Sequence, residues 1–223
     1  MGDLTEGAAV TAEALGLRGP RGWVYRGVAL EAEPGTLAVL AGPAGSGRTS
    51  LLLTLGGRMK PGEGHAAIAG LRLPQQAAAV RRLAALGPVP GVNDLEGTLT
   101  VAEHLRERRL LHFSRRTPRR SVDQVLGLTG LAADGLPGGL GTPVRTLDPL
   151  QALRLSTALA LLGRPRLLCV DDAEERLSAE DREAAWILLR AVADSGTTVL
   201  ATALDAPDHA DVTVRLESAD AHA

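Results

Sequence analysis

The sequence contains few cysteine, lysine and aromatic residues. Among its 223 residues there is one cysteine, Cys169, which excludes a framework of disulfide bonds and favours a reducing compartment. Lysine occurs once, at Lys60, whereas the other 23 basic residues are arginines, and Trp, Tyr and Phe together number four. Because arginine is so common in this chain, an arginine at any one position is weaker evidence for a function than it is elsewhere.

A strong net charge and a long apolar run are also absent. The formal net charge is −2 and the isoelectric point is about 6.2, whereas nucleic-acid-binding domains usually exceed about 9, so we expect no nucleic-acid partner. No apolar run reaches the roughly 18 residues that a membrane-spanning helix needs. Residues 1–19 carry Asp3, Glu6 and Glu13 before any arginine, which is not typical of a signal peptide. We therefore expect a cytoplasmic protein that reaches the inner face of a membrane only through a partner.

The order of apolar segments predicts an α/β fold with a mostly parallel core sheet flanked by helices. A hydrophobic content of 45% is enough for a substantial core, and strand signals alternate with helix signals along the chain. Helix starts are indicated by two capping boxes, Thr100–Glu103 and Ser121–Gln124, and by the pair Asp148-Pro149. The expected strands are 23–33, 36–41, 65–69, 84–89, 166–171 and 197–202, and the expected helices begin near residues 50, 75, 100, 121, 148 and 178.

A glycine-rich segment follows the apolar strand 36–41 and precedes an apolar helix. Its sequence, Gly42-Pro43-Ala44-Gly45-Ser46-Gly47-Arg48-Thr49, fits the pattern G-x-x-x-x-G-K-[ST] with arginine in place of lysine. Glycines allow backbone N–H groups to face phosphate oxygens, and the following helix adds its positive N-terminus. A plain glycine-rich turn is the alternative, but the flanking strand and helix favour a phosphate-binding loop. The candidate cofactor-binding residues are Gly42, Pro43, Ala44, Gly45, Ser46, Gly47, Arg48, Thr49 and Ser50.

The apolar strand Leu167–Val170 ends in two adjacent carboxylates, Asp171 and Asp172. Beside a phosphate loop, Asp171 and the hydroxyl of Thr49 would hold Mg²⁺, and Asp172 would polarise water as the catalytic residue. The alternative is a strand that simply ends in two solvated aspartates. The sequence therefore predicts a metal site at Thr49 and Asp171 and a catalytic carboxylate at Asp172.

Together these motifs resemble the nucleotide-binding domain of ATP-binding cassette (ABC) proteins, which are P-loop NTPases. The resemblance covers about residues 24–214 and includes Leu55 to Gly64, Leu99 to Leu105 and Gly163 to Leu168. It implies ATP and Mg²⁺ as cofactors and a transmembrane transporter subunit, or another membrane protein, as a partner. It also implies a homodimer or a heterodimer with another ABC subunit.

The resemblance implies one domain over the whole chain. Residues 1–22 would form an N-terminal extension, an antiparallel β-subdomain would follow, and about residues 91–160 would form a helical subdomain.

Five functional positions of the family are altered here. The loop lysine that grips the β- and γ-phosphates is Arg48, and the catalytic glutamate is the shorter Asp172. The glutamine that contacts Mg²⁺ and water falls on Gly91. The switch histidine falls on Ala203, and His209 would substitute only after a register shift. The resemblance therefore implies that hydrolysis is weak or absent.

The fifth altered position is the signature LSGGQ, which falls on Leu147-Asp148-Pro149-Leu150-Gln151. In the family this segment holds the γ-phosphate of ATP bound to the opposite subunit. At about 4 Å and an effective dielectric near 20, the charge of Asp148 would repel one phosphate charge by roughly 4 kcal/mol. Leu150 would also block the close backbone approach that a glycine permits.

Both halves of the composite ABC site are altered, so even a competent partner would leave both sites damaged. We therefore expect a nucleotide-binding pseudo-ATPase. Two alternatives remain: a working ATPase that energises transport, with Asp172 as general base, and an ABC-like protein without a transporter.

The family's adenine-stacking aromatic residue is not found at its expected place near Gly19. Trp23 or Tyr25 could serve instead, and the alternative for both is packing within the β-subdomain.

A group of arginines lies in the predicted helical subdomain. Contact with anionic lipid headgroups or with an acidic loop of a membrane partner is one interpretation, and a solvated helix end is the other. The group comprises Arg106, Arg108, Arg109, Arg115, Arg116, Arg119 and Arg120.

Overall fold

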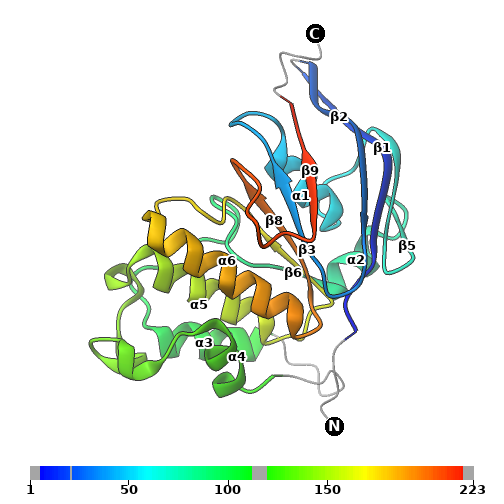
Figure 1. Ribbon diagram of the computed structural model, residues 1–223. Coiled ribbons are helices and arrows are strands. Elements are labelled where there is room, and N and C mark those ends of the chain that lie inside the picture. The colour runs from blue at the N-terminus through cyan, green and yellow to red at the C-terminus, as the bar shows by residue number, and fades with distance from the viewer. Residues whose placement is uncertain (1–5, 21, 112–119, 218–223) are drawn as a thin grey trace.

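The computed structural model describes residues 6–20, 22–111 and 120–217 and contains two sheets (Figure 1). A five-stranded sheet has the order β6-β7-β8-β3-β9, and all of its pairings are parallel. A four-stranded antiparallel sheet has the order β2-β1-β4-β5. The predicted α/β fold is therefore confirmed. The strands are β1 (Val10–Gly19), β2 (Gly22–Ala32), β3 (Leu37–Ala41), β4 (Glu63–Ile68), β5 (Leu71–Leu73), β6 (Ala84–Leu86), β7 (Leu167–Val170), β8 (Thr198–Ala203) and β9 (Val212–Arg215).

Strand β3 is buried on both of its faces. Leu37 and Val39 face one hydrophobic cluster, whereas Ala38 and Leu40 face a second cluster on the other side of the sheet. Successive side chains of a strand point to opposite faces, so a strand covered on both faces must be apolar throughout. This explains the uninterrupted apolar run before the glycine-rich loop.

Helices cover both faces of the parallel sheet (Figure 1). Four of them gather on one face, and α1 and α2 lie between this sheet and the antiparallel sheet, where Leu51, Leu52 and Val80 join the second hydrophobic cluster. The helices are α1 (Arg48–Leu55), α2 (Ala77–Leu83), α3 (Val101–Leu111), α4 (Val122–Thr129), α5 (Pro149–Leu161) and α6 (Ala179–Asp194), with short 3-10 turns η1 (Ala133–Gly135), η2 (Gly139–Gly141) and η3 (Val144–Thr146).

The predicted helix starts are observed. Ser121 and Gln124 form a capping box at the start of α4, and Thr100 exchanges hydrogen bonds with Glu103 at the start of α3. Helix α5 begins with Asp148 as N-cap and proline at its first position. These local signals fix the helices because each one supplies acceptors for N–H groups that a helix leaves free.

Residues 10–19 belong to the β-subdomain, although the sequence analysis placed them in an N-terminal extension. They form β1, which pairs with both β2 and β4. Its inward residues Val10 and Ala12 alternate with the exposed Thr11 and Glu13, a weak pattern because small residues carry little hydrophobic signal. Strands β5 and β9 were also not expected from the sequence.

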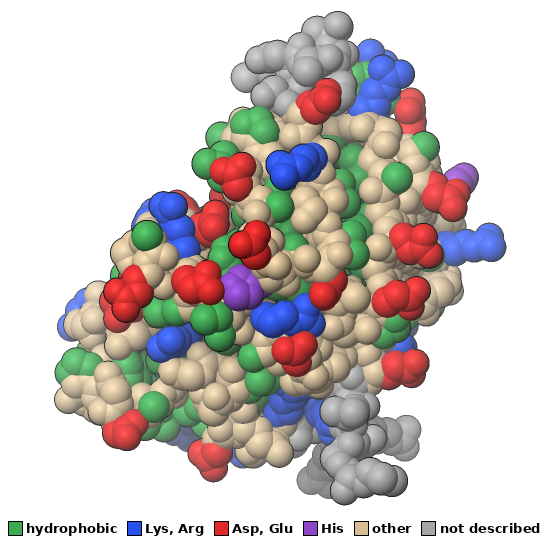
Figure 2. All heavy atoms as spheres, viewed as in Figure 1, with side chains coloured by type: hydrophobic (Ala, Val, Ile, Leu, Met, Phe, Trp, Pro, Cys, Tyr) green, Lys and Arg blue, Asp and Glu red, His purple; other side chains and the backbone are tan. Residues whose placement is uncertain are grey.

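The outer face of the helical layer carries mixed charge. Figure 2 shows acidic and basic side chains interspersed over the side of the molecule that carries α6. This face therefore has no field of one sign. None of the helices within the described ranges combines the length and the apolar character needed to cross a membrane.

Candidate functional site

The glycine-rich loop lies between the carboxyl end of β3 and the start of α1, as predicted. Gly47 has a φ of +84°, and a Cβ at this position would lie 2.2 Å from the carbonyl oxygen of Val24. Gly45 has a φ of +80°, but no atom lies within 4 Å of its Cβ position. The loop thus needs glycine at position 47 for close approach as well as for backbone conformation, and at position 45 for conformation alone.

The N-terminus of α1 opens toward this loop. Its N-cap residue is Gly47, which offers no side-chain cap, and no acidic residue of the described chain lies in its first turn. The first N–H groups of an α-helix have no helical acceptor, so they are available to an anion here.

Two buried polar atoms of the loop have no hydrogen-bond partner among the described residues. They are Oγ of Ser46, a residue that is 1% exposed, and Nη1 of Arg48. A buried polar group without a partner costs about 1–3 kcal/mol, and more when it is charged. An anion with several oxygen atoms would relieve this cost. The loop therefore fits a phosphate group on chemistry as well as on shape.

Asp171 lies at the carboxyl end of β7, is 4% exposed and accepts two hydrogen bonds. Oγ1 of Thr49 donates to its Oδ2 at 2.8 Å, and Oγ1 of Thr202 donates to its Oδ1 at 2.6 Å. The structure thus brings together the two residues of the predicted metal site. Thr202 was not expected, although β7 and β8 are parallel neighbours whose carboxyl ends share one edge of the sheet.

The pair Thr49 and Asp171 fits Mg²⁺ in donor chemistry, since both offer oxygen. Within the described residues, no group of three or more His, Cys, Asp or Glu side chains could hold a metal ion. Mg²⁺ in nucleotide sites is usually held by one or two protein groups together with phosphates and water. The site therefore fits a magnesium ion that accompanies a nucleotide.

Asp172 is held from two sides. Its Oδ1 lies 2.9 Å from Nη2 of Arg48, and its backbone N–H donates to Oγ1 of Thr202 at 2.7 Å. Its φ of +43° is unusual for a residue with a side chain. Burial and the neighbouring Asp171 raise the pKa of this carboxyl above its ordinary value, and Arg48 opposes that rise. The predicted catalytic carboxylate is therefore already paired with the predicted phosphate-binding arginine.

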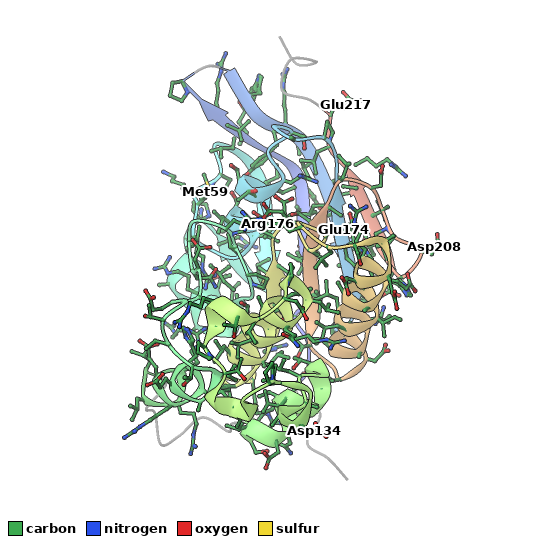
Figure 3. The ribbon with its side chains drawn as sticks, turned by 90° about the vertical axis from the view of Figure 1, so that its left-hand side faces the viewer. Met59, Asp134, Glu174, Arg176, Asp208 and Glu217 are labelled. Atoms are coloured by element: carbon green, nitrogen blue, oxygen red, sulfur yellow. The ribbon has the colours of Figure 1, made fainter. Side chains whose placement is uncertain are left out.

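A cavity of about 420 Å³ adjoins the two carboxylates. Its lining includes Asp171 and Asp172 on one side and Leu147 and Pro149 on the other. Figure 3 labels Glu174 and Arg176 on the loop that follows β7, and Arg176 belongs to the cavity lining. The carboxyl edge of the sheet and the start of α5 thus face a common space within one chain.

The start of α5 carries the segment that the resemblance aligned with the family's signature. Asp148 accepts a hydrogen bond from the N–H of Gln151 at 2.7 Å, and the Gln151 side chain accepts one from the N–H of Asp148 at 3.1 Å. Pro149 has no N–H, and Leu150 is buried at 9% exposure. This helix start therefore caps the N–H of Gln151, has no N–H at Pro149 and adds a negative charge.

The positions aligned with the family's glutamine and histidine carry no polar side chain. Gly91 forms a turn with a φ of +73°, and its N–H donates to the carboxylate of Asp94. Ala203 is the last residue of β8 and is buried. His209 lies beyond β8, and its ring pairs with Glu183 of α6 at 2.9 Å. The structure thus directs His209 toward α6.

The two aromatic candidates for base stacking differ in access. Tyr25 is 2% exposed, and its hydroxyl donates to Oγ1 of Thr54 at 2.8 Å, so the packing interpretation holds for it. Trp23 is partly exposed, with the guanidinium groups of Arg18 and Arg26 over its ring at 5.3 and 4.8 Å from the centroid. A base that stacks on Trp23 would therefore compete with these cation–π contacts for the ring.

The predicted arginine group is described only in part. Arg115, Arg116 and Arg119 lie outside the described residues. Arg106 is exposed on α3, whereas Arg108, Arg109 and Arg120 line one cavity where α3, α4 and the end of α5 meet.

The comparisons with known proteins agree with this geometry. The family model described as "ABC transporter" matches residues 25–175. The cytochrome c biogenesis ATP-binding export protein CcmA of Aromatoleum aromaticum is 34% identical over 196 residues, which cover 86% of each chain. ATP-binding cassette sub-family A member 7 of Mus musculus is 31% identical over 185 residues. That match covers 83% of this chain but only 8% of the mouse protein.

Solved structures show the same fold. One is cbiO1 of Clostridium perfringens, described as part of the transporter complex cbiONQ. It has a TM-score of 0.77 at 18% identity, and the match covers 95% of this chain and 85% of cbiO1. A dimeric ATP-binding cassette in a post-hydrolysis state, bound to ADP and Pi, has a TM-score of 0.72 at 21% identity, with 94% and 96% covered.

Proposed function

The chain belongs to the ABC transporter family, and on this premise we propose that it binds Mg-ATP through a divergent phosphate loop and hydrolyses it weakly or not at all. The observation that carries the binding half is that two buried atoms, Ser46 Oγ and Arg48 Nη1, have no hydrogen-bond partner in the described part of the chain. Both lie beside the open N-terminus of α1, where phosphate oxygens would satisfy them.

The residues of the site have separate tasks in this proposal. Gly45 and Gly47 let the backbone N–H groups surround the phosphates, and Arg48 contributes a fixed positive charge. Thr49 and Asp171 hold the metal, and Thr202 keeps the Asp171 carboxylate in place. Mg²⁺, when bound with the nucleotide, supplies charge neutralisation at the phosphates.

Weak hydrolysis follows from the state of Asp172. A general base must present a free carboxylate lone pair to the attacking water. In this chain Arg48 engages that carboxylate, and the side chain is one methylene shorter than a glutamate. Gly91 and Ala203 add no polar side chain that could position the water.

A working ATPase is the second candidate, and the raised pKa of Asp172 favours it. The raised pKa of this carboxyl makes it a better proton acceptor than an ordinary aspartate. The variant Asp172→Ala separates the two candidates, since it abolishes turnover only if Asp172 is the base.

The partner in this proposal is a transmembrane subunit, and the chain would lie on the cytoplasmic side of the membrane. Support comes from the relatives: CcmA is described as an export protein, and cbiO1 as part of a transporter complex. A homodimer or a heterodimer with another ABC subunit is part of the same proposal, since a solved cassette of this fold is dimeric.

The binding half is tested by titrating the chain with a fluorescent ATP analogue and Mg²⁺. Arg48→Ala should weaken binding about ten- to a hundredfold, because it removes a charge-assisted hydrogen bond worth about 1.5–3 kcal/mol. Arg182→Ala on the exposed face of α6 is the matched control and should leave binding unchanged. Equal affinity of wild type and Arg48→Ala would refute binding through this loop.

A further inference from the structure

A second cavity, which we call the arginine cavity, lies where α3, α4 and the end of α5 meet. It has a volume of about 470 Å³ and is lined by Arg108, Arg109 and Arg120 together with residues 121–124 and Leu162. Binding cavities for small molecules commonly measure about 300–1,000 Å³. The arginine cavity is therefore large enough for a small ligand.

The arginine cavity is at the opposite end of the parallel sheet from the phosphate loop. Leu162 precedes β7 in the chain, whereas the loop follows the carboxyl end of β3. With all strands parallel and about 3.3 Å per residue, the five residues of β3 alone separate the two ends by roughly 15 Å. Figure 1 shows α3 and α4 at the lower end of the molecule, away from α1. The cavity is thus separate from the nucleotide site.

Positive charge exceeds negative charge in the described lining of this cavity. No Asp or Glu of the described residues forms an ion pair with Arg108, Arg109 or Arg120. Among the described residues of the lining Asp123 alone is acidic, so their three positive charges and one negative charge leave a formal +2. That value matches the charge of about −2 on a phosphate monoester near pH 7.

The structural tasks of these arginines use only part of their donors. Nε of Arg108 donates to the carbonyl of Leu159 at 3.3 Å, and Nη2 of Arg120 donates to Oγ of Ser195 at 3.0 Å. Nη1 of Arg120 is buried and has no partner in the described chain. Helix-end carbonyls carry only a fraction of a unit charge, so they do not balance whole guanidinium charges.

Helix α4 adds backbone donors to the same lining. Its capping box uses the N–H groups of Ser121 and Gln124. The N–H groups of Val122 and Asp123, in the first turn, have no helical acceptor. Guanidinium forks and free amides of a helix start are the donors that bind tetrahedral phosphate oxygens.

Burial makes these charges responsive to an anion. It lowers the pKa of Arg108 and of Arg120. Repulsion from Arg58 lowers the pKa of Arg108 further and the charge of Glu107 opposes this, whereas repulsion from Arg164 lowers the pKa of Arg120 further. Both groups stay protonated at neutral pH, so an anion in the cavity would relieve stored repulsion.

We propose that the arginine cavity is a second ligand site, distinct from the nucleotide site, that binds the phosphoryl group of a phosphate-bearing molecule. The phosphoryl oxygens accept hydrogen bonds from Arg109, from the free donors of Arg108 and Arg120, and from the N–H groups in the first turn of α4. The ligand is a soluble phosphate compound or the phosphate monoester headgroup of a lipid, and the experiment below separates these two sources.

The test is a titration of the ¹⁵N-labelled full chain with inorganic pyrophosphate, followed residue by residue in amide NMR spectra. The amides of residues 121–124 report on the arginine cavity, and those of residues 45–50 report separately on the phosphate loop. We expect saturable shifts at residues 121–124 that Arg109→Gln weakens at least about tenfold, the loss of one charge-assisted hydrogen bond. Arg48→Ala should leave these shifts unchanged, so failure of the nucleotide proposal and failure of this one are distinguishable.

Two controls keep the result specific. Arg106→Gln, on the same helix but outside the cavity lining, should leave the shifts at residues 121–124 unaltered. Arg109 has no hydrogen bond or ion pair in the described chain, so Arg109→Gln should also keep the wild-type melting temperature. No shift at residues 121–124, or shifts of equal affinity in Arg109→Gln, would overturn the proposal.

The source of the phosphoryl group is identified by flotation with phosphatidylcholine vesicles, with and without phosphatidic acid. Binding that needs phosphatidic acid and is lost in Arg109→Gln supports a lipid headgroup. Shifts with pyrophosphate but no flotation support a soluble phosphate compound.

Discussion

The starts of α1 and α5 both border the carboxyl edge of the sheet, but α1 has no side-chain cap for its first N–H groups, whereas α5 has one. Helix α1 follows Gly47, has no side-chain cap and has no acidic residue in its first turn. At the start of α5 the Asp148 side chain accepts from the N–H of Gln151, and the Gln151 side chain accepts from the N–H of Asp148. A proline, which has no N–H, stands at the first helical position. The first arrangement leaves its N–H groups open to an anion, whereas the second leaves only the N–H of Leu150 in its first turn and adds the negative charge of Asp148.

The comparison explains why binding and hydrolysis can separate in this chain. A phosphate group needs free donors, and the α1 end supplies them together with Arg48. Hydrolysis in a composite site also needs donors from the start of α5 of an opposite subunit, where Asp148 places a negative charge. In the proposed function, one end of the site binds the nucleotide and the other end opposes closure against an opposite subunit.

The largest effect is expected from a substitution in the glycine-rich loop before α1. Gly47→Ala should abolish detectable nucleotide binding, because its Cβ would collide with the Val24 carbonyl in a left-handed conformation, at a combined cost of about 3 kcal/mol or more. Gly45→Ala is the matched control, with a similar φ but no neighbour within 4 Å, and should lose about 1–2 kcal/mol of stability only. The measurements are analogue titration and thermal unfolding, and equal losses in both variants would argue against the close approach at Gly47.

The next effect removes the metal ligand. Asp171→Asn should lose the Mg²⁺-dependent part of nucleotide affinity, about tenfold, while binding without Mg²⁺ stays near the wild-type value. The check is to titrate both proteins with and without EDTA. An unchanged Mg²⁺ dependence would place the metal elsewhere.

A smaller effect sharpens the role of the pair between Arg48 and Asp172. Asp172→Asn should raise nucleotide affinity about threefold, because it removes a negative charge that competes with phosphate for Arg48. The pKa of Asp172 is raised, so the wild-type carboxyl takes up a proton as the pH falls toward that value. The advantage of the variant should therefore shrink as the pH falls and the wild-type carboxyl becomes protonated. A constant ratio of affinities across this range would contradict the competition.

The smallest effect is expected on stability, from substitution of Asp148, the N-cap of α5. Asp148→Ala should lower the free energy of unfolding by about 1 kcal/mol, whereas Asp148→Ser should stay near the wild-type value because serine caps as well as aspartate. Urea unfolding measures both. A loss as large in Asp148→Ser would mean that the charge of Asp148, rather than its cap, stabilises α5.

Much of the site was predictable because it depends on local signals. The strand, glycine-rich loop and helix around residues 36–55 follow from composition and turn chemistry alone. Asp148 was likewise recognisable as a cap from its place before Pro149. Such signals act over a few residues, so the sequence carries them directly.

The contacts that decide chemistry were not predictable because they join distant strands. Thr202 reaches both Asp171 and the backbone of Asp172 only through the pairing of β7 with β8. The ion pair of Arg48 with Asp172 depends on side-chain reach across the same edge. Strand β1 was missed since the small residues Ala12 and Gly16 at its buried positions carry little hydrophobic contrast.

The most direct test of the account measures phosphate release by the purified chain at a saturating concentration of Mg-ATP, with nucleotide binding confirmed in the same sample. The account predicts saturable binding and a release rate no higher than that of Asp172→Ala. Steady turnover at about 1 s⁻¹ or faster, as ordinary enzymes show, that Asp172→Ala abolishes would contradict it.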